Sequence, residues 1–264
     1  MKKKLIIASF LCAAVGVAAV VWVVCTPMTM CLTFDDGNVA HAKVAAPTLE
    51  KYGWRGAFNI VTARIGRPDI SFCEMMKWSD VETLFKNGHE VYPHTHFPDL
   101  KNPMLSHYNL RKLAEAGDFK AIEYQVRESK KMIEDKLGVT PSMFCLPFNA
   151  MNDDVAKIIR SYGMEPLNCD RRNFPTHPGH KIMSISDYVK AEWRKGSGHV
   201  DIMMHGIVRA EGGWEPFEDA AHFDRFCREL KDVENSGIVR IVGYAESHNY
   251  TKWGGGNDFS QVSV

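Results

Sequence analysis

Thr33-Phe34-Asp35-Asp36-Gly37 closes an apolar stretch that begins at Met28 and is typical of a buried strand. Two adjacent carboxylates therefore lie at the carboxyl end of that strand, where they repel each other unless a cation or a hydrogen-bond donor lies between them. A divalent metal ion would remove this repulsion. The alternative is a turn with an Asx-type cap, which is the commoner meaning of Asp-Asp-Gly in other contexts.

Two histidines end a second strand-like segment, Gly88-His89-Glu90-Val91-Tyr92-Pro93-His94-Thr95-His96. On an extended backbone, residues i and i+2 face the same side, so His94 and His96 can approach one metal ion together with Asp36. A set of two imidazoles and one carboxylate leaves coordination positions for water and substrate, as catalytic sites do. Two solvent-facing histidines are the alternative for such a pair in isolation.

A third apolar run, residues 200–204, ends at His205. A buried strand that delivers one imidazole to its carboxyl end is a common placement of a general acid or base in α/β enzymes. Between the histidine pair and His205, a further strand-like segment ends in Pro147 and Phe148. The order and spacing of these motifs, over residues 28–250, resemble those of the polysaccharide deacetylases, carbohydrate esterases of the NodB-homology type.

The resemblance implies a role for each matching residue. Asp35 would be the general base, Asp36 and His94 would bind a divalent metal ion, and His205 would be the general acid. Phe148 falls where the family has an aromatic residue whose backbone N–H helps to form the oxyanion hole. The implied reaction is metal-assisted removal of acetyl groups from N- or O-acetylated saccharides, with Zn²⁺ as the preferred ion and Co²⁺, Ni²⁺ or Mn²⁺ as alternatives.

The chain departs from the family at the second metal-binding histidine, which the family carries four residues after the first. That position is Pro98 here. His96 is the natural substitute if the loop is one residue shorter, and Asp99 and His107 are weaker candidates. Thr95, between the two histidines of this chain, would brace the loop by hydrogen bonding.

A second departure concerns the arginine that orients the catalytic base in other members of the family, because Cys145 stands at its position. Arg171 or Arg172, in the next strand-end segment along the chain, would supply the positive charge instead. The family also has an aspartate near this point that tunes the late histidine. Asp170 is therefore expected to pair with His205.

Composition excludes other classes of protein and of site. The formal net charge is zero and no basic stripe is present, so nucleic acid is not an expected partner. The seven cysteines include no Cys-x-x-Cys pair, so no metal role is expected for them. Those in apolar strand-like segments, such as Cys31 and Cys145, are expected to behave as small buried hydrophobic groups.

The N-terminus is typical of an export signal. Three lysines at residues 2–4 precede an uncharged apolar run from Leu5 to Cys25. Residues 1–27 are therefore interpreted as a signal peptide or membrane anchor, and residues 28–264 as one exported catalytic domain, periplasmic, secreted or membrane-anchored. Cleavage is favoured over anchoring, because an anchor would leave only Thr26 and Pro27 between the membrane and the first strand.

Strands and helices alternate along the chain in the manner of βαβ units. They predict an α/β fold, a distorted or incomplete (β/α) barrel of seven to eight parallel strands of the NodB type, with the motifs at the carboxyl ends of the strands. Helices are expected at residues 79–87, with a Ser79/Glu82 capping box, at 152–162 and within 119–137. Strands are expected at residues 28–34, 56–61, 90–94, 142–148, 165–169, 182–185, 200–205 and 238–242.

Aromatic residues near the motif loops favour an acetylated saccharide or cell-wall polysaccharide as the substrate, because sugar rings stack on flat apolar side chains. Trp214 is the best candidate for a side chain on which a sugar ring stacks, and Trp193 and Tyr92 are weaker candidates. Two other functions remain open. One is a metal-independent amide hydrolase of the same superfamily, of the allantoinase-like kind, and the other is a non-catalytic saccharide-binding relative.

Overall fold

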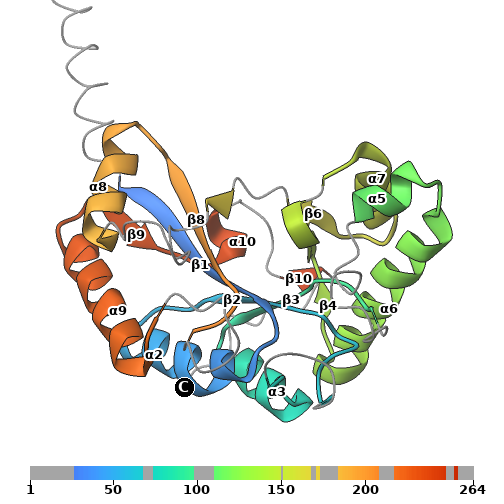
Figure 1. Ribbon diagram of the computed structural model, residues 1–264, viewed down its shortest axis with the longest axis horizontal. Coiled ribbons are helices and arrows are strands. Elements are labelled where there is room, and N and C mark those ends of the chain that lie inside the picture. Colours follow the sequence, from blue (N-terminus) through green and yellow to red (C-terminus); the bar gives the residue numbers. More distant parts are fainter. Residues whose placement is uncertain are drawn as a thin grey trace, which may run out of the picture.

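The computed structural model describes residues 27–67, 74–97, 110–149, 151–167, 171–172, 184–207, 217–247 and 253–254. Parallel strands occupy the centre and helices surround them (Figure 1). The main sheet has six strands in the order β3-β2-β1-β8-β7, with β9 also paired to β1. Its members are β1 (Met28–Asp36), β2 (Ala57–Ile60), β3 (Glu90–Pro93), β7 (Arg171–Arg172), β8 (His199–Met204) and β9 (Val239–Ile241).

Two smaller strand pairs accompany this sheet. Strand β5 (Met143–Cys145) pairs in parallel with β6 (Glu165–Leu167), and β4 (Thr140–Pro141) pairs in antiparallel with β10 (Trp253–Gly254). Among the described residues, no backbone ladder joins β3 to β5 or β6 to β7. The parallel strands with helices outside them confirm the predicted α/β fold, an incomplete (β/α) barrel.

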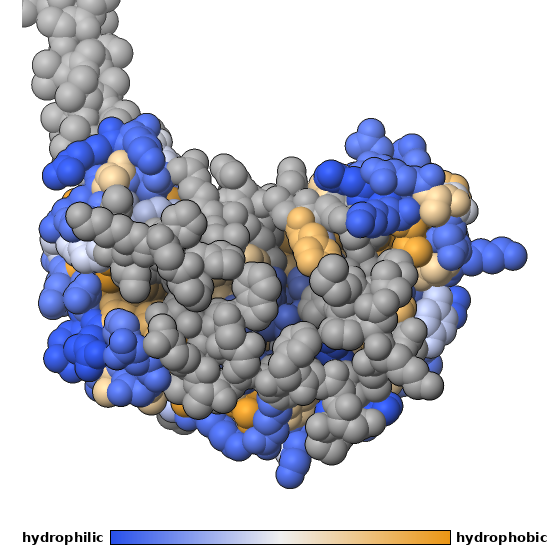
Figure 2. All heavy atoms as spheres, in the orientation of Figure 1, coloured by the Kyte–Doolittle hydropathy of each residue, from blue (hydrophilic) through white to orange (hydrophobic). Residues whose placement is uncertain are grey.

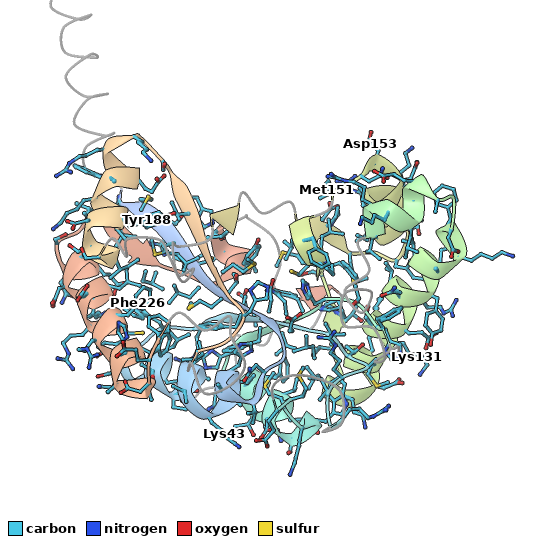
Figure 3. The ribbon with its side chains drawn as sticks, in the orientation of Figure 1. Lys43, Lys131, Met151, Asp153, Tyr188 and Phe226 are labelled. Carbon is cyan, nitrogen blue, oxygen red and sulfur yellow. The ribbon has the colours of Figure 1, made fainter. Side chains whose placement is uncertain are left out.

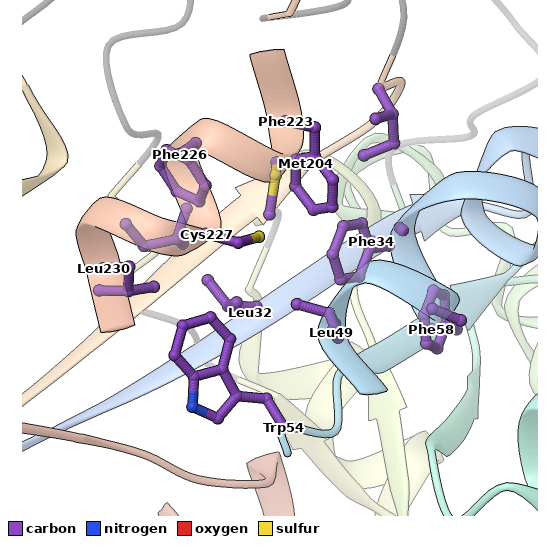
Figure 4. Packing of buried hydrophobic residues seen from close by; sticks show 14 of the residues in the cluster. Leu32, Phe34, Leu49, Trp54, Phe58, Met204, Phe223, Phe226, Cys227 and Leu230 are labelled. Atoms are coloured by element: carbon purple, nitrogen blue, oxygen red, sulfur yellow. The ribbon is translucent and has the colours of Figure 1, made fainter. Parts of the chain in front are cut away.

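The two faces of β1 have different surroundings. Leu32 and Phe34 are buried against helices α2 (Ala46–Lys51) and α9 (Ala220–Asn235), as Figure 4 shows, and Met30 belongs to the same buried cluster. The helix residues that meet them include Leu49, Phe223, Cys227 and Leu230. The alternate residues of β1 point to the other face of the strand, which is the barrel interior. That face carries Cys31, Thr33 and Asp35.

The helices cover the outside of the barrel and present charged residues to solvent. Helix α6 (Phe119–Leu137) fills the range within which a helix was expected, and its buried stripe includes the expected Ile122, Val126 and Ile133. Lys131 on its other face points away from the protein, and hydrophilic side chains cover the outer helix faces (Figures 2 and 3). The remaining helices are η1 (His41–Ala45), α3 (Trp78–Lys86), α5 (Leu110–Glu115), the short η2 (Pro147–Asn149), α7 (Asp153–Ser161), α8 (Ile185–Arg194) and α10 (Tyr244–Ser247).

Two local predictions were wrong. Helix α3 begins at Trp78, and its cap is the Asp80 carboxylate, which accepts the backbone N–H of Lys77 at 2.7 Å, so the predicted Ser79/Glu82 box does not form. An acidic side chain three residues after the cap does this regardless of the capping residue. A strand was expected at residues 182–185, but Ile185 is the first residue of helix α8. Residues 182–183 lie outside the described ranges.

No helix in the described part of the chain is both long and apolar enough to cross a membrane. The expected signal or anchor, residues 1–26 together with Pro27, lies outside that part except for its last residue.

The first testable prediction concerns Gly56, which lets α2 approach β1. A Cβ atom there would lie 2.9 Å from both Leu49 Cδ1 and Phe34 Cε2 and 3.2 Å from the Leu32 carbonyl oxygen. Gly56→Ala should therefore lower the free energy of unfolding by about 1–3 kcal/mol, as measured by urea unfolding. Gly198 is the matched control, because nothing lies within 4 Å of the corresponding Cβ position. Equal stability of the two variants would contradict the packing described.

Candidate active site

The carboxyl ends of β1 and β3 bring three predicted site residues together. Asp35 and Asp36 end β1, and His94 directly follows β3. His94 Nε2 lies 3.7 Å from Asp35 Oδ2 and 3.9 Å from Asp36 Oδ1. The Asp35 and His94 side chains are buried, whereas the Asp36 side chain is 19% exposed. One imidazole nitrogen thus faces two carboxylates, one of which reaches solvent.

The protonation of His94 is set by its other ring nitrogen. Nδ1–H donates a hydrogen bond of 2.9 Å to the carbonyl oxygen of Cys145, which can only accept. In the neutral imidazole, the lone pair is then on Nε2, the nitrogen that faces Asp35 and Asp36. A lone pair directed at two carboxylates requires a proton or a cation between them. The donor set therefore fits a divalent ion, and the backbone carbonyl orients His94 as such partners commonly do in metal sites.

Asp35 has a partner that the sequence analysis did not anticipate. Asn59 of β2 is its neighbour in register, and Asn59 Nδ2 donates to Asp35 Oδ1 at 2.7 Å, both side chains being buried. The only signal in the sequence was one polar residue inside the apolar strand 56–61. The charge predicted from Arg171 or Arg172 stays a prediction. Those residues form β7, beside Asp201 and Ile202 of β8, and their side chains lie outside the described part of the structure.

Three non-glycine residues in the described ranges have positive φ, and all three are predicted site residues. They are Asp36 (φ 79°), Thr95 (φ 116°) and Phe148 (φ 57°). Each such conformation costs about 1–3 kcal/mol, and such residues cluster at functional sites. Phe148 lies in a short turn, Pro147–Asn149, and its side chain is 65% exposed. The strain is thus concentrated at the ends of β1, β3 and β5.

Thr95 fixes the loop after β3 through its main chain. Its carbonyl oxygen accepts hydrogen bonds from Thr62 N at 3.0 Å and Thr62 Oγ1 at 3.2 Å. The expected brace therefore exists, but the Thr95 hydroxyl is not the group that makes it. That hydroxyl is buried and has no hydrogen-bond partner among the described residues.

His96 follows Thr95 and contacts the same threonine, Thr62. Its Nδ1 is 2.9 Å from Thr62 Oγ1, and its ring meets the edge of Tyr124 on α6 with centroids 5.9 Å apart. Burial lowers the pKa of His96, and the nearby Glu128 opposes this effect. Within the described residues, the potential ligand atoms that lie within 4.8 Å of one another at this site belong to Asp35, His94 and Cys145. The role of His96 as the third ligand stays a prediction.

The sequence placed Cys145 where other members of the family carry the arginine that orients the catalytic base, but predicted no metal role for it. It is fully buried, as expected of a small hydrophobic group, but its sulfur belongs to the group with Asp35 and His94.

The two weaker candidates for stacking on a sugar ring are not placed at the described site. Tyr92 is buried in the barrel, where its hydroxyl donates to Glu90 at 3.2 Å, and Trp193 packs partly buried against the outer core. Trp214 and Asp170 lie outside the described residues.

His41 joins the first motif to the last. It is fully buried in the π-helical turn η1, and its Nε2–H donates to the carbonyl oxygen of His205 at 2.6 Å. Burial lowers the pKa of His41 to about 4, although the His205 carbonyl and the charges of Asp36 and Asp35 oppose the shift. His205 itself directly follows β8 and is partly exposed. The predicted general acid is therefore held by its main chain at the same edge of the sheet.

Comparison with known proteins agrees with this geometry. The family model described as polysaccharide deacetylase matches residues 25–167, more than half of the chain. The chain belongs to the polysaccharide deacetylase family. Two curated relatives are 26% identical, chitin deacetylase 1 of Cryptococcus neoformans var. grubii over 52% of this chain and chitin deacetylase of Arthroderma benhamiae over 61%. The matches span 24% and 40% of those proteins, less than half of their length.

Solved structures share the fold of this polysaccharide deacetylase family member at low identity. The Bc1960 peptidoglycan N-acetylglucosamine deacetylase has a TM-score of 0.60 at 14% identity, with 86% of this chain and 91% of that chain covered. The chitin deacetylase of Colletotrichum lindemuthianum has 0.57 at 15% identity, over 86% and 89%. A mutant of BA3943, a CE4 family pseudoenzyme with restored activity, has 0.56 at 15% identity, over 84% and 68%.

The second prediction uses the pKa of His41. The folded protein holds this group neutral down to about pH 4, whereas the unfolded chain binds the proton near pH 6.5, so stability is lost as the pH falls through that interval. The loss should reach about 3 kcal/mol at pH 4. His41→Gln keeps a donor for the His205 carbonyl but does not titrate, so its loss of stability on acidification should be smaller by that amount. Urea unfolding of both proteins from pH 7.5 to 4, with a chelator present, measures this. Identical pH dependence would contradict the assignment.

Proposed function

We propose that this protein is a metal-dependent hydrolase that removes acetyl groups from N- or O-acetylated saccharides. One observation carries the proposal, namely that Nε2 of His94, with its tautomer fixed by Cys145, faces the carboxylates of Asp35 and Asp36 at less than 4 Å. Membership of the polysaccharide deacetylase family supports the same reaction class. The ion would be Zn²⁺, with Co²⁺, Ni²⁺ or Mn²⁺ able to replace it.

Asp36, His94 and a third ligand would hold the ion. When bound, it supplies a Lewis acid for the acyl oxygen and lowers the pKa of a bound water molecule from about 16 toward about 7. Asp35 is the general base in this proposal, because Asn59 fixes one of its oxygens and leaves the other directed toward His94. Water attacks the acetyl carbonyl carbon while Asp35 takes its proton.

Two further groups complete the reaction. The backbone N–H of Phe148, held at positive φ, would donate to the developing oxyanion, a contribution of about 3 kcal/mol for one well-placed donor. His205 would protonate the departing amine or alcohol as the bond to the acetyl carbon breaks. The products are acetate and the free saccharide amine or hydroxyl. The hydrogen bond from His41 to the His205 carbonyl supports this role, because it restrains the backbone that carries the acid.

The substrate and location follow from the relatives and the N-terminus. The relatives are named for chitin and peptidoglycan, which are N-acetylated polysaccharides. We extend this to an acetylated cell-wall polysaccharide as the substrate here, and to an exported protein with its catalytic domain outside the cytoplasm. Residues 5–25 would either be cleaved or attach the protein to the membrane.

A non-catalytic saccharide-binding relative is the second candidate. The departures at Pro98 and Cys145 favour it, because both lie at positions where the family carries functional residues. Metal content and acetate release separate the two candidates.

The third prediction tests the proposed function. The purified protein should release acetate from N-acetylated chitooligosaccharides, and a chelator should abolish the release. Asp35→Asn should lower the rate by about 10²- to 10⁴-fold, the usual contribution of general base catalysis, while the bound metal is retained. Asp135→Asn, on the exposed face of α6, is the matched control and should keep full activity. Absence of acetate release from the metal-loaded protein would favour the binding relative, and loss of metal from Asp35→Asn would make Asp35 a ligand.

The fourth prediction concerns the ligands of the active-site ion. His94→Ala should remove one metal ion per chain, as measured by elemental analysis after dialysis, because its Nε2 faces both carboxylates. His96→Ala should weaken binding of the same ion. Retention of this ion by His94→Ala would show that the site is assigned wrongly. If His96→Ala binds like the unchanged protein and Cys145→Ser does not, the third ligand is the cysteine.

A further inference from the structure

A second group of potential metal ligands lies deeper in the barrel, away from the active site. Cys31, His199 and Asp201 each offer one ligand atom, and the three atoms lie within 4.8 Å of one another. We propose that these residues form a second metal site that binds Zn²⁺. The proposal does not depend on the deacetylase activity.

The backbone brings the three side chains together on one face of the sheet. Strands β1 and β8 are adjacent and parallel, and their register pairs Thr29 with His199 and Cys31 with Asp201. His199 and Asp201 are two residues apart on β8, so they point to the same side. All the ligands therefore come from two neighbouring hydrogen-bonded strands, which hold them without a mobile loop.

The His199 ring is oriented on both sides, as in many metal sites. Nδ1 lies 2.8 Å from Thr29 Oγ1, which itself donates to the Gly198 carbonyl at 3.3 Å. With a cation on Nε2, the His199 Nδ1–H donates to the Thr29 oxygen, whose own proton goes to the Gly198 carbonyl. Nε2 lies 2.7 Å from Asp201 Oδ1, and that pair of atoms requires a proton or a cation between them.

The Cys31 thiol makes two weak hydrogen bonds that a metal ion would replace. Its Sγ lies 3.3 Å from both the Val242 carbonyl and the Ser247 hydroxyl, and one thiol proton cannot satisfy both at full strength. Binding of Zn²⁺ would release the thiol proton and the proton shared by His199 and Asp201, and would form one bond each to sulfur, nitrogen and oxygen. The fourth position of a tetrahedral ion would take water.

The donor set and the burial select the ion. One thiolate, one imidazole and one carboxylate suit Zn²⁺ and Co²⁺, whereas Ca²⁺ and Mg²⁺ require oxygen ligands. Cys31 and Asp201 are buried and the His199 side chain is 25% exposed, which gives the ion a path of entry. Cys31 and Asp35 lie four residues apart on the same face of β1, about 13 Å at the usual strand rise. The ion would therefore stabilise the barrel and take no part in the deacetylation.

The fifth prediction tests this site by spectroscopy and stoichiometry on the full chain. The metal-free protein is titrated with Co²⁺, which reports a thiolate ligand by a charge-transfer band in the near ultraviolet. The band should form in the unchanged protein and in His94→Ala, and should be absent from Cys31→Ser and His199→Gln. Zinc content should fall by one ion per chain in Cys31→Ser. Thr29→Val should keep the band but weaken cobalt binding by about 10- to 100-fold.

Matched cysteine variants make the outcome decisive. Cys227→Ser, buried in α9 at a distance from both sites, and Cys145→Ser should keep the band. If no band forms in His94→Ala, which has lost the active-site ion, or if the band persists when Cys31→Ser is added to His94→Ala, the proposal is wrong. A band lost only in Cys145→Ser would overturn it as well, since the thiolate would then belong to the active site. Failure of the deacetylase proposal is read separately, from acetate release and from the ion that responds to His94→Ala.

Discussion

The hydrogen bond from His94 Nδ1 to the carbonyl oxygen of Cys145 is the interaction on which the site depends. It crosses from the end of β3 to the end of β5, where no backbone ladder joins these two strands in the described part of the chain. The same bond fixes the tautomer of His94 and so determines which nitrogen faces Asp35 and Asp36. This one hydrogen bond thus links the ends of β3 and β5 and leaves His94 Nε2 available as a metal ligand.

Burial explains why this edge needs such specific partners. Asp35 lies where water cannot solvate its charge, so an amide donor such as Asn59 has to replace the lost hydrogen bonds. Asp36 keeps partial contact with solvent and adopts a left-handed backbone conformation at the end of its strand. Asp35 and Asp36 are adjacent on β1, but the first side chain is buried beside Asn59 and the second is partly exposed to solvent. That difference allows two neighbouring carboxylates to serve as base and ligand, rather than to compete for one proton.

The sequence predicted what depends on local pattern. Continuous apolar runs located β1 and β8 to within two residues, and the apolar stripe of Ile122, Val126 and Ile133 placed a helix within residues 119–137. The parallel fold and the gathering of Asp35, Asp36 and His94 followed from strand ends carrying polar residues. The contacts of Asn59, Cys145 and His41 were missed because each joins two different elements of the fold. Asn59 of β2 meets Asp35 of β1, the Cys145 carbonyl after β5 meets His94 after β3, and His41 of η1 meets the His205 carbonyl after β8. No periodicity reports that an asparagine will lie opposite an aspartate.

The loop after β3 shows where a sequence pattern and a three-dimensional site diverge. His94 and His96 have the i, i+2 spacing that would direct both to one side of a strand, but β3 ends at Pro93 and Thr95 takes a φ of 116°. The chain is therefore not extended between the two histidines, and the alternation rule no longer applies. His96 meets Thr62 and Tyr124, whereas the sulfur of Cys145 lies on the side of Asp35 and His94. A backbone conformation at one residue thus decides which side chains are candidates for the third position on the metal.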